Sequence, residues 1–246
     1  MSTRNNPLAA RKSPLLCYVT DRRALTEANP QESLIALSKK VEQLVMAGVD
    51  CVQIREKDLS AADLATLTRQ SLRIAASRSS PTRILVNDRL DVAIAERAHG
   101  VHLGEKSLLV ADAKRLVDSV PSNQAPDESF LIGVSCHSLE AAQTAQRNGA
   151  DYIFFGPIFA TPSKESFGAP QGTERLRQVC RAVSIPVLAI GGITLDNAEF
   201  CLAAGAAGLA AIRLFQDATD PAGAMRRLRQ LVSYLRQLPA DRKPDH

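Results

Sequence analysis

The chain has 246 residues, 45% of them hydrophobic and 23% charged, with a formal net charge of +4 at pH 7. A chain of this kind can bury a large core, and α/β barrels often reach this size as one domain, so a disordered protein is excluded. Seven Phe, three Tyr and no Trp offer no platform for stacking bases, and no apolar run is long enough to cross a bilayer, so neither nucleic acid nor a membrane is an expected partner.

The first expected element is a tail. Residues 1–14 contain no acidic residue and no apolar centre of the kind that a secretion signal has, and we predict that they are disordered. Eight short apolar runs follow, and their continuous apolarity is typical of strands that are buried on both faces of a parallel sheet. The runs cover residues 15–19, 51–54, 84–86, 100–103, 131–134, 152–155, 186–190 and 207–212.

Amphipathic stretches with apolar residues at helical spacing separate these runs. Ser60, Ser138 and Thr194 stand where the N-caps of three of them are expected. The predicted helices cover residues 31–47, 61–76, 90–97, 110–117, 139–148, 172–183, 195–203 and 221–235.

The same helix-to-strand joint recurs along the chain, in the phrases "AGVDCVQI", "RAHGVHL", "NGADYIFF" and "AGAAGLAAI". A recurring helix end, glycine turn and strand favours a (β/α)₈ TIM barrel of class α/β over an open doubly wound sheet, which stays the structural alternative. We therefore expect a single barrel domain over residues 15–236, followed by a polar C-terminal tail over residues 237–246.

Polar and cationic residues follow the strands at their carboxyl ends, where a barrel places its functional site. After the second strand, alternation points Gln53, Arg55 and Lys57 the same way, and two cations that face inward need an anion. The other candidates are Asn87 and Asp88 after the third strand, Ser135 and His137 after the fifth, Thr161, Ser163 and Lys164 after the sixth, Gly191 and Gly192 after the seventh, and Arg213 after the eighth. Together they predict a site for a phosphorylated molecule.

Each of these signals also has an ordinary structural interpretation. Asn87 and Asp88 suit a helix cap, Gly191 and Gly192 suit a tight turn, and His137 suits capping of the next helix. The chain carries no recognisable nucleophile–base pair, zinc-protease motif or P-loop. Cations, hydroxyls and a carboxylate able to hold Mg²⁺ instead suit the departure of a phosphate or pyrophosphate group by charge stabilisation.

The five cysteines form no C-x-x-C pair and lie mostly inside apolar runs. This pattern indicates buried thiols in a reducing compartment rather than disulfides or a zinc site. We expect a cytoplasmic protein, and the sequence leaves the formation of a homo-oligomer open.

Seven segments resemble, in order, the thiamine phosphate synthase/thiazole tautomerase family. They are "YVTDR", "VQIREKDLS", "VNDRLDVA", "GVHLG", "GVSCHSLEAA", "GADYIFFGPIFATPSK" and "IPVLAIGGIT". The resemblance extends from about residue 18 to residue 215. It implies a TIM barrel that joins an aminopyrimidine pyrophosphate to a thiazole phosphate, with Mg²⁺-assisted loss of pyrophosphate and capture of the pyrimidine cation by the thiazole nitrogen.

The resemblance also implies a role for each candidate residue. Asp88 would be the Mg²⁺ ligand, and His137 matches an acid–base residue of the tautomerase branch. Those implied to hold the pyrimidine pyrophosphate are Gln53, Arg55, Lys57, Asn87, Ser135 and Lys164, of which the cations Arg55, Lys57 and Lys164 would act in catalysis. Those implied to hold the thiazole phosphate are Thr161, Ser163, Gly192, Ile212 and Arg213.

Three positions depart from the synthase pattern. Ser107 stands where synthases usually have a second metal-binding Asp, Arg213 stands in place of a small Ser, and His99 stands in place of an Asp. The "LG-x-x-SL" form is similar to the tautomerase branch, whereas Gly156-Pro157 and the set of cations are similar to the synthase branch. The expected activity is therefore thiamine phosphate synthesis, with a thiazole tautomerase and a non-catalytic binder of thiamine-related phosphates as alternatives.

Overall fold

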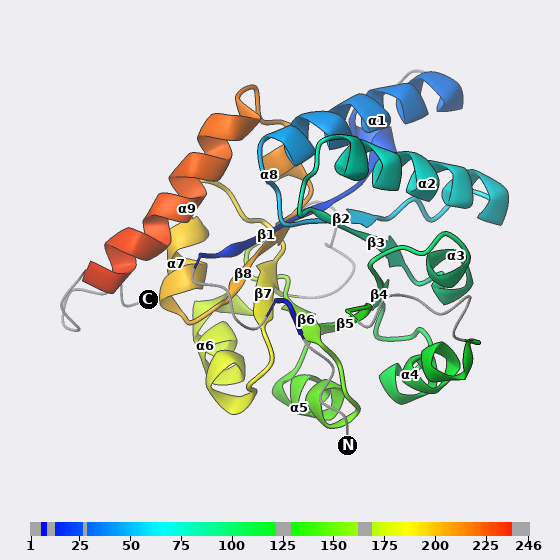
Figure 1. The fold of residues 1–246 in the computed structure, drawn as a ribbon. Coiled ribbons are helices and arrows are strands. Elements are labelled where there is room, and N and C mark those ends of the chain that lie inside the picture. The colour runs from blue at the N-terminus through cyan, green and yellow to red at the C-terminus, as the bar shows by residue number, and fades with distance from the viewer. Residues whose placement is uncertain (1–5, 9–12, 27–28, 122–128, 162–168, 238–246) are drawn as a thin grey trace.

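The structure is a computed structural model of the whole chain, and it describes residues 6–8, 13–26, 29–121, 129–161 and 169–237. Eight parallel strands form a closed barrel in which each strand pairs with the next along the chain and β8 pairs with β1 (Figure 1). The strands are β1 (Leu15–Val19), β2 (Cys51–Ile54), β3 (Arg83–Asn87), β4 (Gly100–Leu103), β5 (Leu131–Cys136), β6 (Tyr152–Phe155), β7 (Val187–Ile190) and β8 (Gly208–Ala211). The expectation of a (β/α)₈ barrel is confirmed, and the open sheet is excluded.

Helices alternate with the strands and surround the barrel (Figure 1). They are α1 (Pro30–Met46), α2 (Ala61–Ser77), α3 (Leu90–Ala95), α4 (Val110–Ser119), α5 (Leu139–Arg147), α6 (Gly172–Ala182), α7 (Ala198–Ala203), α8 (Arg213–Gln216) and α9 (Pro221–Gln237). A 3₁₀ helix, η1 (Arg22–Ala24), follows β1. The two shortest of these elements, η1 and α8, were not predicted, because three or four residues carry no periodic pattern.

Two of the three predicted helix caps are present. Ser60 Oγ accepts from Asp63 N at 3.1 Å, and Ser138 Oγ accepts from Ala141 N at 3.1 Å. The prediction for Thr194 is wrong by three residues, because the N-cap residue of α7 is Asn197. Thr194 instead closes the turn that precedes the helix.

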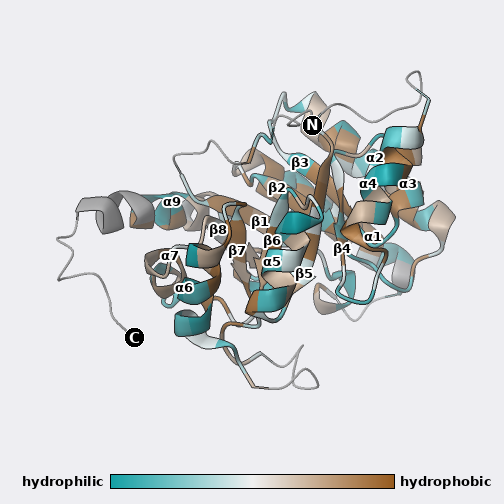
Figure 2. Ribbon diagram, turned by 90° about the horizontal axis from the view of Figure 1, so that it is seen from below, coloured by the Kyte–Doolittle hydropathy of each residue, from teal (hydrophilic) through white to brown (hydrophobic). Residues whose placement is uncertain are grey.

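The core has two layers. The larger cluster lies between the strands and the helices, and the apolar faces of the helices turn toward it (Figure 2). The smaller cluster, which we call the barrel interior, is formed by inward-facing strand residues and by one residue from outside the barrel, Leu8. Its buried members are Leu8, Leu15, Cys17, Val19, Cys51, Leu85, Leu131, Tyr152, Phe154, Leu188 and Ala210.

Part of the segment that we expect to be a disordered tail lies on the barrel. Asn6 Nδ2 donates to Asp151 O at 2.7 Å, and Leu8 is 4% exposed. This contact places Leu8 beside the amino end of β6, because Asp151 directly precedes that strand.

All five cysteines are free thiols, and four of them are buried. Burial raises the pKa of Cys136 and of Cys201 to about 12, so both stay protonated at neutral pH. None of the helices within the described ranges combines the length and the apolar character that crossing a lipid bilayer requires.

Candidate active site at the mouth of the barrel

Parallel strands in a closed barrel all point their carboxyl ends toward one opening, which we call the mouth. The predicted site residues stand at or just beyond the ends of β2, β3, β5, β6, β7 and β8. The fold therefore brings the described members of this set to the same end of the molecule. Ser163 and Lys164 lie outside the described residues.

A row of hydrogen-bonded side chains joins the ends of β2 and β3. Gln53 is only 2% exposed, and its Nε2 donates to Asn87 Oδ1 at 2.8 Å. Asn87 Nδ2 in turn donates to Asp88 Oδ2 at 2.7 Å. Because a buried amide with a fixed partner has a fixed orientation, this row gives Asn87 and Asp88 one defined arrangement.

The loop after β4 holds Asp88 from its other side. Asp88 Oδ1 accepts from Gly104 N at 2.8 Å and from the hydroxyl of Ser107. Burial by itself raises the pKa of Asp88, but the hydrogen bonds from Ser107, Gly104 and Asn87 outweigh it and lower the pKa below its ordinary value. The Asp88 carboxylate is therefore ionised at neutral pH.

The donor set around Asp88 fits Mg²⁺ as a partial site. Mg²⁺ favours oxygen ligands and is commonly held by one or two carboxylates together with substrate phosphates and water. Asp88 supplies one exposed, ionised carboxylate. Within the described residues no group of three or more His, Cys, Asp or Glu side chains forms a metal site. This agrees with a partial site in which a substrate phosphate and water complete the coordination.

The cations that follow β2 stand on either side of a buried acid. Arg55 is half-buried and Lys57 is exposed, whereas Glu56 between them is 6% exposed. Glu56 is bound by Thr20 and Arg22, and the backbone N–H of Arg55 also donates to Thr20 Oγ1, at 2.9 Å. The loop is thus attached to the end of β1.

A buried histidine that we did not select from the sequence lies beneath Ser135. His102 on β4 is 2% exposed, its Nε2 lies 2.9 Å from Ser135 Oγ, and its Nδ1 lies 3.1 Å from the hydroxyl of Tyr152. Burial raises the pKa of Tyr152 well above its ordinary value, so this hydroxyl keeps its proton. When that proton is donated to Nδ1, the neutral imidazole donates from Nε2 to Ser135 Oγ, and the Ser135 hydroxyl proton is left for another acceptor.

The sequence did carry one signal for this histidine. "GVHL" is an apolar strand with a single polar residue in it, and alternation turns that residue to the same face as Gly100. The ring of Phe154 lies against His102, with 4.1 Å between ring centroids. No sequence pattern indicates that partner, because the two residues belong to β4 and β6, which are not neighbours in the barrel.

His137, beyond the end of β5, is oriented by the main chain. Its Nδ1 contacts the carbonyl oxygen of Gly156, which can only accept, so Nδ1 carries a proton. Its Nε2 lies 3.9 Å from Glu105 Oε2, which is an ion-pair distance rather than a hydrogen bond. His137 therefore connects the loops after β4, β5 and β6.

The loops after β6 and β7 are joined by main-chain hydrogen bonds. Ile158 N donates to Ile190 O and Phe159 N donates to Gly191 O, each at 3.0 Å. Gly192 has a φ of +66°, and a Cβ at this position would lie 2.6 Å from Ala160 O. Only glycine fits such a position, so the close approach of the two loops accounts for Gly192 without any ligand.

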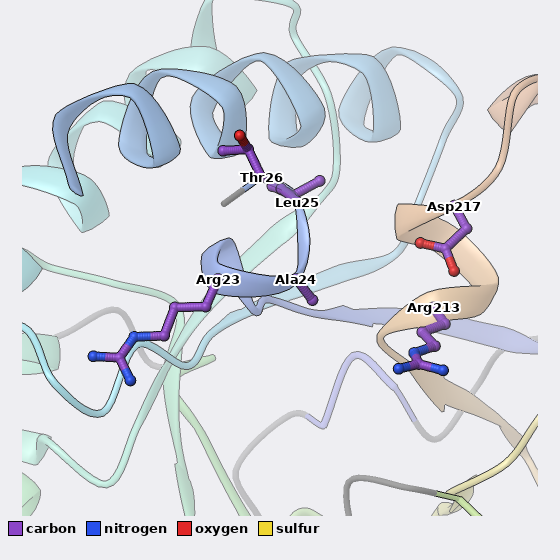
Figure 3. Close-up of a pocket in the computed structure, with 6 residues that line it drawn as sticks. All are labelled: Arg23, Ala24, Leu25, Thr26, Arg213 and Asp217. Carbon is purple, nitrogen blue, oxygen red and sulfur yellow. The ribbon is translucent and has the colours of Figure 1, made fainter. Parts of the chain in front are cut away.

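A pocket of about 400 Å³ opens to one side of the mouth, between η1 and α8 (Figure 3). Its lining residues are Arg23, Ala24, Leu25, Thr26, Arg213 and Asp217. Of the predicted site residues that the structure describes, Arg213, directly after Ile212, is the one that lines it. The Arg23 and Arg213 side chains extend from different walls of this pocket (Figure 3).

Comparisons with known proteins point to one family. Residues 17–215 match the family model described as thiamine monophosphate synthase. A thiamine-phosphate synthase from Roseiflexus sp. (strain RS-1) is 36% identical, over 94% of this chain and 91% of that protein, and one from Albidiferax ferrireducens is 42% identical, over 80% and 84%. The solved structure of thiamine phosphate pyrophosphorylase from Pyrococcus furiosus is 30% identical with a TM-score of 0.73, covering 89% of this chain and 96% of that one.

Proposed function

We propose that this chain, which belongs to the thiamine monophosphate synthase family, is a transferase that makes thiamine phosphate from an aminopyrimidine pyrophosphate and a thiazole phosphate and releases pyrophosphate. The observation that carries the proposal is the row from Gln53 through Asn87 to Asp88, which lies at the strand ends next to Arg55 and Lys57. Amides, an ionised carboxylate and two cations together suit a pyrophosphate and its metal better than any neutral ligand.

The pyrophosphate would be held on the side of β2 and β3. Arg55 offers a planar fork and Lys57 a mobile point charge, and the two together stabilise the negative charge that builds up as the group leaves. Lys164 is proposed as a third cation for the same group. Gln53 and Asn87 would orient the pyrimidine end, because their amides are already fixed toward each other.

Asp88 is the residue that would hold Mg²⁺, and the ion when bound supplies charge neutralisation on the pyrophosphate oxygens. The depressed pKa of Asp88 keeps the carboxylate available at neutral pH. Ser135 would donate its hydroxyl proton to a pyrophosphate oxygen, because His102 occupies its acceptor side.

The thiazole phosphate would be held on the side of β6, β7 and β8. Thr161, Ser163 and the main chain at Gly192 are proposed to bind its phosphate, together with Ile212 and Arg213. Loss of pyrophosphate leaves a pyrimidine cation, which the thiazole nitrogen captures as a new C–N bond forms. The protein's part in this step is to hold the two substrates in line and to exclude water.

The test is synthesis by the purified protein from the two substrates with Mg²⁺. We expect thiamine phosphate and pyrophosphate in equal amounts, and a loss of about 100-fold in kcat/KM for Arg55→Ala, since it removes a charge-assisted contact made in the transition state. Arg69→Ala, in a surface ion pair with Glu96 between α2 and the end of α3, is the matched control and should leave the rate unchanged. Equal rates for the two variants would contradict the assignment of Arg55.

A second activity, isomerisation of a thiazole phosphate carboxylate, is favoured by one observation. Ser107 stands beside Asp88 where a second carboxylate is expected, so the site offers a metal ion only one of the two expected charges. This favours a reaction that requires no metal. His137, a candidate catalytic residue, would act as acid and base. Interconversion of the thiazole tautomers without any thiamine phosphate would establish this activity in place of the first.

We also propose a cytoplasmic location, because all five cysteines are free thiols and four of them are buried.

A further inference from the structure

The segment Arg55–Asp58 alternates two cations with two acids, and the structure treats the two kinds differently. Among the described residues neither Arg55 nor Lys57 forms an ion pair. Both acids, in contrast, are paired with residues that follow β1. Within the described part of the chain the two acids are therefore paired with basic residues, whereas the two cations next to them in sequence have no acidic partner.

Arg22 is the centre of this arrangement. Its Nη1 donates to Glu56 Oε2 at 3.0 Å and to Asp58 Oδ1 at 2.7 Å, and its Nη2 donates to Asp58 Oδ2 at 2.5 Å. One guanidinium thus binds both carboxylates, and Arg23 adds a contact to Asp58 at 2.8 Å. The hydrogen bonds from Arg22 hold the pKa of Asp58 well below its ordinary value.

The pair between Arg22 and Glu56 is deeply buried. Their side chains are 5% and 3% exposed, and Glu56 also accepts from Thr20 Oγ1 at 2.6 Å and from the Arg22 backbone N–H at 3.2 Å. Buried ion pairs contribute little net stability, because the cost of desolvating two charges offsets their attraction. Stability therefore does not explain why a buried ion pair lies next to the proposed anion-binding site.

The segment that carries Arg22 is itself held on its far side. Tyr18 Oη donates to Gln216 Oε1 at 2.8 Å, and Gln216 Nε2 donates to Asp21 O at 3.1 Å. Gln216 is 4% exposed and belongs to α8, so η1 is fixed between the loop after β2 and the wall at β8. Arg22 is consequently held in place by contacts within the protein itself.

From these contacts we infer that Arg22 is a positioning residue that binds Glu56 and Asp58 and so prevents these acids from neutralising Arg55 and Lys57. Without the Arg22 guanidinium, Glu56 would lose the buried cation that neutralises it, and Asp58 would keep only its contact with the exposed Arg23, so each cation would have a less neutralised carboxylate one residue away in sequence. An internal ion pair of that kind competes directly with an anionic substrate. The inference rests on the proposed function only in naming pyrophosphate as the anion.

The test measures binding of inorganic pyrophosphate, with and without Mg²⁺, by titration calorimetry, so it needs no turnover. Arg22→Met should weaken pyrophosphate binding by about tenfold or more, because both acids lose the guanidinium that neutralises them next to the two cations. Arg22→Met/Glu56→Gln/Asp58→Asn should regain most of the lost affinity, since its amides carry no charge. Binding of the thiazole phosphate should change less than about twofold in either variant.

Two variants keep this test decisive. Arg69→Met removes an arginine that binds Glu96 through two hydrogen bonds far from the mouth, and it should bind pyrophosphate like the wild type. If Arg22→Met does not fold, Arg22→Lys takes its place, because one ammonium cannot bind both carboxylates as the fork does. Arg22→Lys/Asp58→Asn should then regain the pyrophosphate affinity that Arg22→Lys loses.

Three results would overturn the inference. They are unchanged pyrophosphate binding in a folded Arg22 variant, no recovery when the acids are removed from it, and an equal loss of thiazole phosphate binding. The wild type and the Arg22 variants could bind pyrophosphate as expected while the wild type forms no thiamine phosphate. That result would contradict the proposed function and leave the role of Arg22 unaffected.

Discussion

At the scale of single residues, Ser107 has the largest chemical consequence, because the family resemblance implies a second metal-binding carboxylate at this position. Ser107 donates to the same oxygen of Asp88 that accepts from Gly104 N. That oxygen is therefore already satisfied by two donors, and the other one accepts from Asn87. An approaching Mg²⁺ meets one carboxylate charge where two were expected, so the free protein should bind the ion weakly.

Ser107→Asp should raise the affinity of the substrate-free protein for Mg²⁺ by about tenfold or more, because a second carboxylate then stands beside Asp88. Without metal the two like charges repel, so the variant should unfold at a lower temperature in a chelator and regain stability when Mg²⁺ is added. Titration calorimetry and thermal unfolding measure the two effects.

Ser107→Asn is the control for this prediction, since it has the same size as the aspartate variant and carries no charge. If the aspartate and asparagine variants bind Mg²⁺ equally, Asp88 does not belong to a metal site. Because this measurement needs no substrate, its result does not depend on the activity of the protein.

The contacts that the sequence could not reveal are those between residues of different elements, far apart in the chain. Arg22 and Glu56 are 34 positions apart, and His102 and Tyr152 are 50 apart. Sequence alternation shows which way a side chain points but not what it meets. Gln53 and Asn87 were selected for their chemistry, and their direct hydrogen bond became visible only with the register of β2 and β3.

At the scale of elements, the strands were predictable because strands buried on both faces contain unbroken apolar runs. Four of the eight have the predicted bounds, and the others differ by one or two residues at an end. Helix starts were less regular. α7 begins at Ala198 rather than at residue 195, because Thr194 accepts from the backbone of Asp196 and Asn197 and so closes a turn first.

The cap of α2 tests whether such local signals carry energy. Ser60 Oγ accepts from Asp63 N, one of the unpaired N–H groups of the first turn. Ser60→Ala should lower the free energy of unfolding by about 1 kcal/mol, measured by urea denaturation. Ser77→Ala, at the exposed other end of the same helix, should change it by less than about 0.5 kcal/mol. Equal effects would show that the cap contributes nothing specific.

At the scale of the whole molecule, the barrel interior changes character along its axis. Apolar side chains such as Leu15, Leu131 and Leu188 fill the lower part of the barrel, from the amino ends of the strands to its middle. Gln53 and Asn87, in contrast, stand at or next to the carboxyl ends of their strands. An apolar floor beneath a polar mouth is the arrangement by which this fold separates stability from chemistry. Substitutions in the floor should therefore affect stability without affecting substrate binding.

Leu8 gives this separation its clearest test, because it reaches the barrel interior from outside the barrel. It is 4% exposed and packs in the same cluster as Leu15. Leu8→Ala should lower the free energy of unfolding by about 2–5 kcal/mol through lost burial and the cavity left behind, with KM for both substrates unchanged. Leu116→Ala, at a 50% exposed position on α4, is the matched control and should stay within about 0.5 kcal/mol of the wild type in urea denaturation. A Leu8 variant as stable as that control would mean that the segment before β1 does not close the barrel, and a changed KM would mean that the floor and the mouth are coupled.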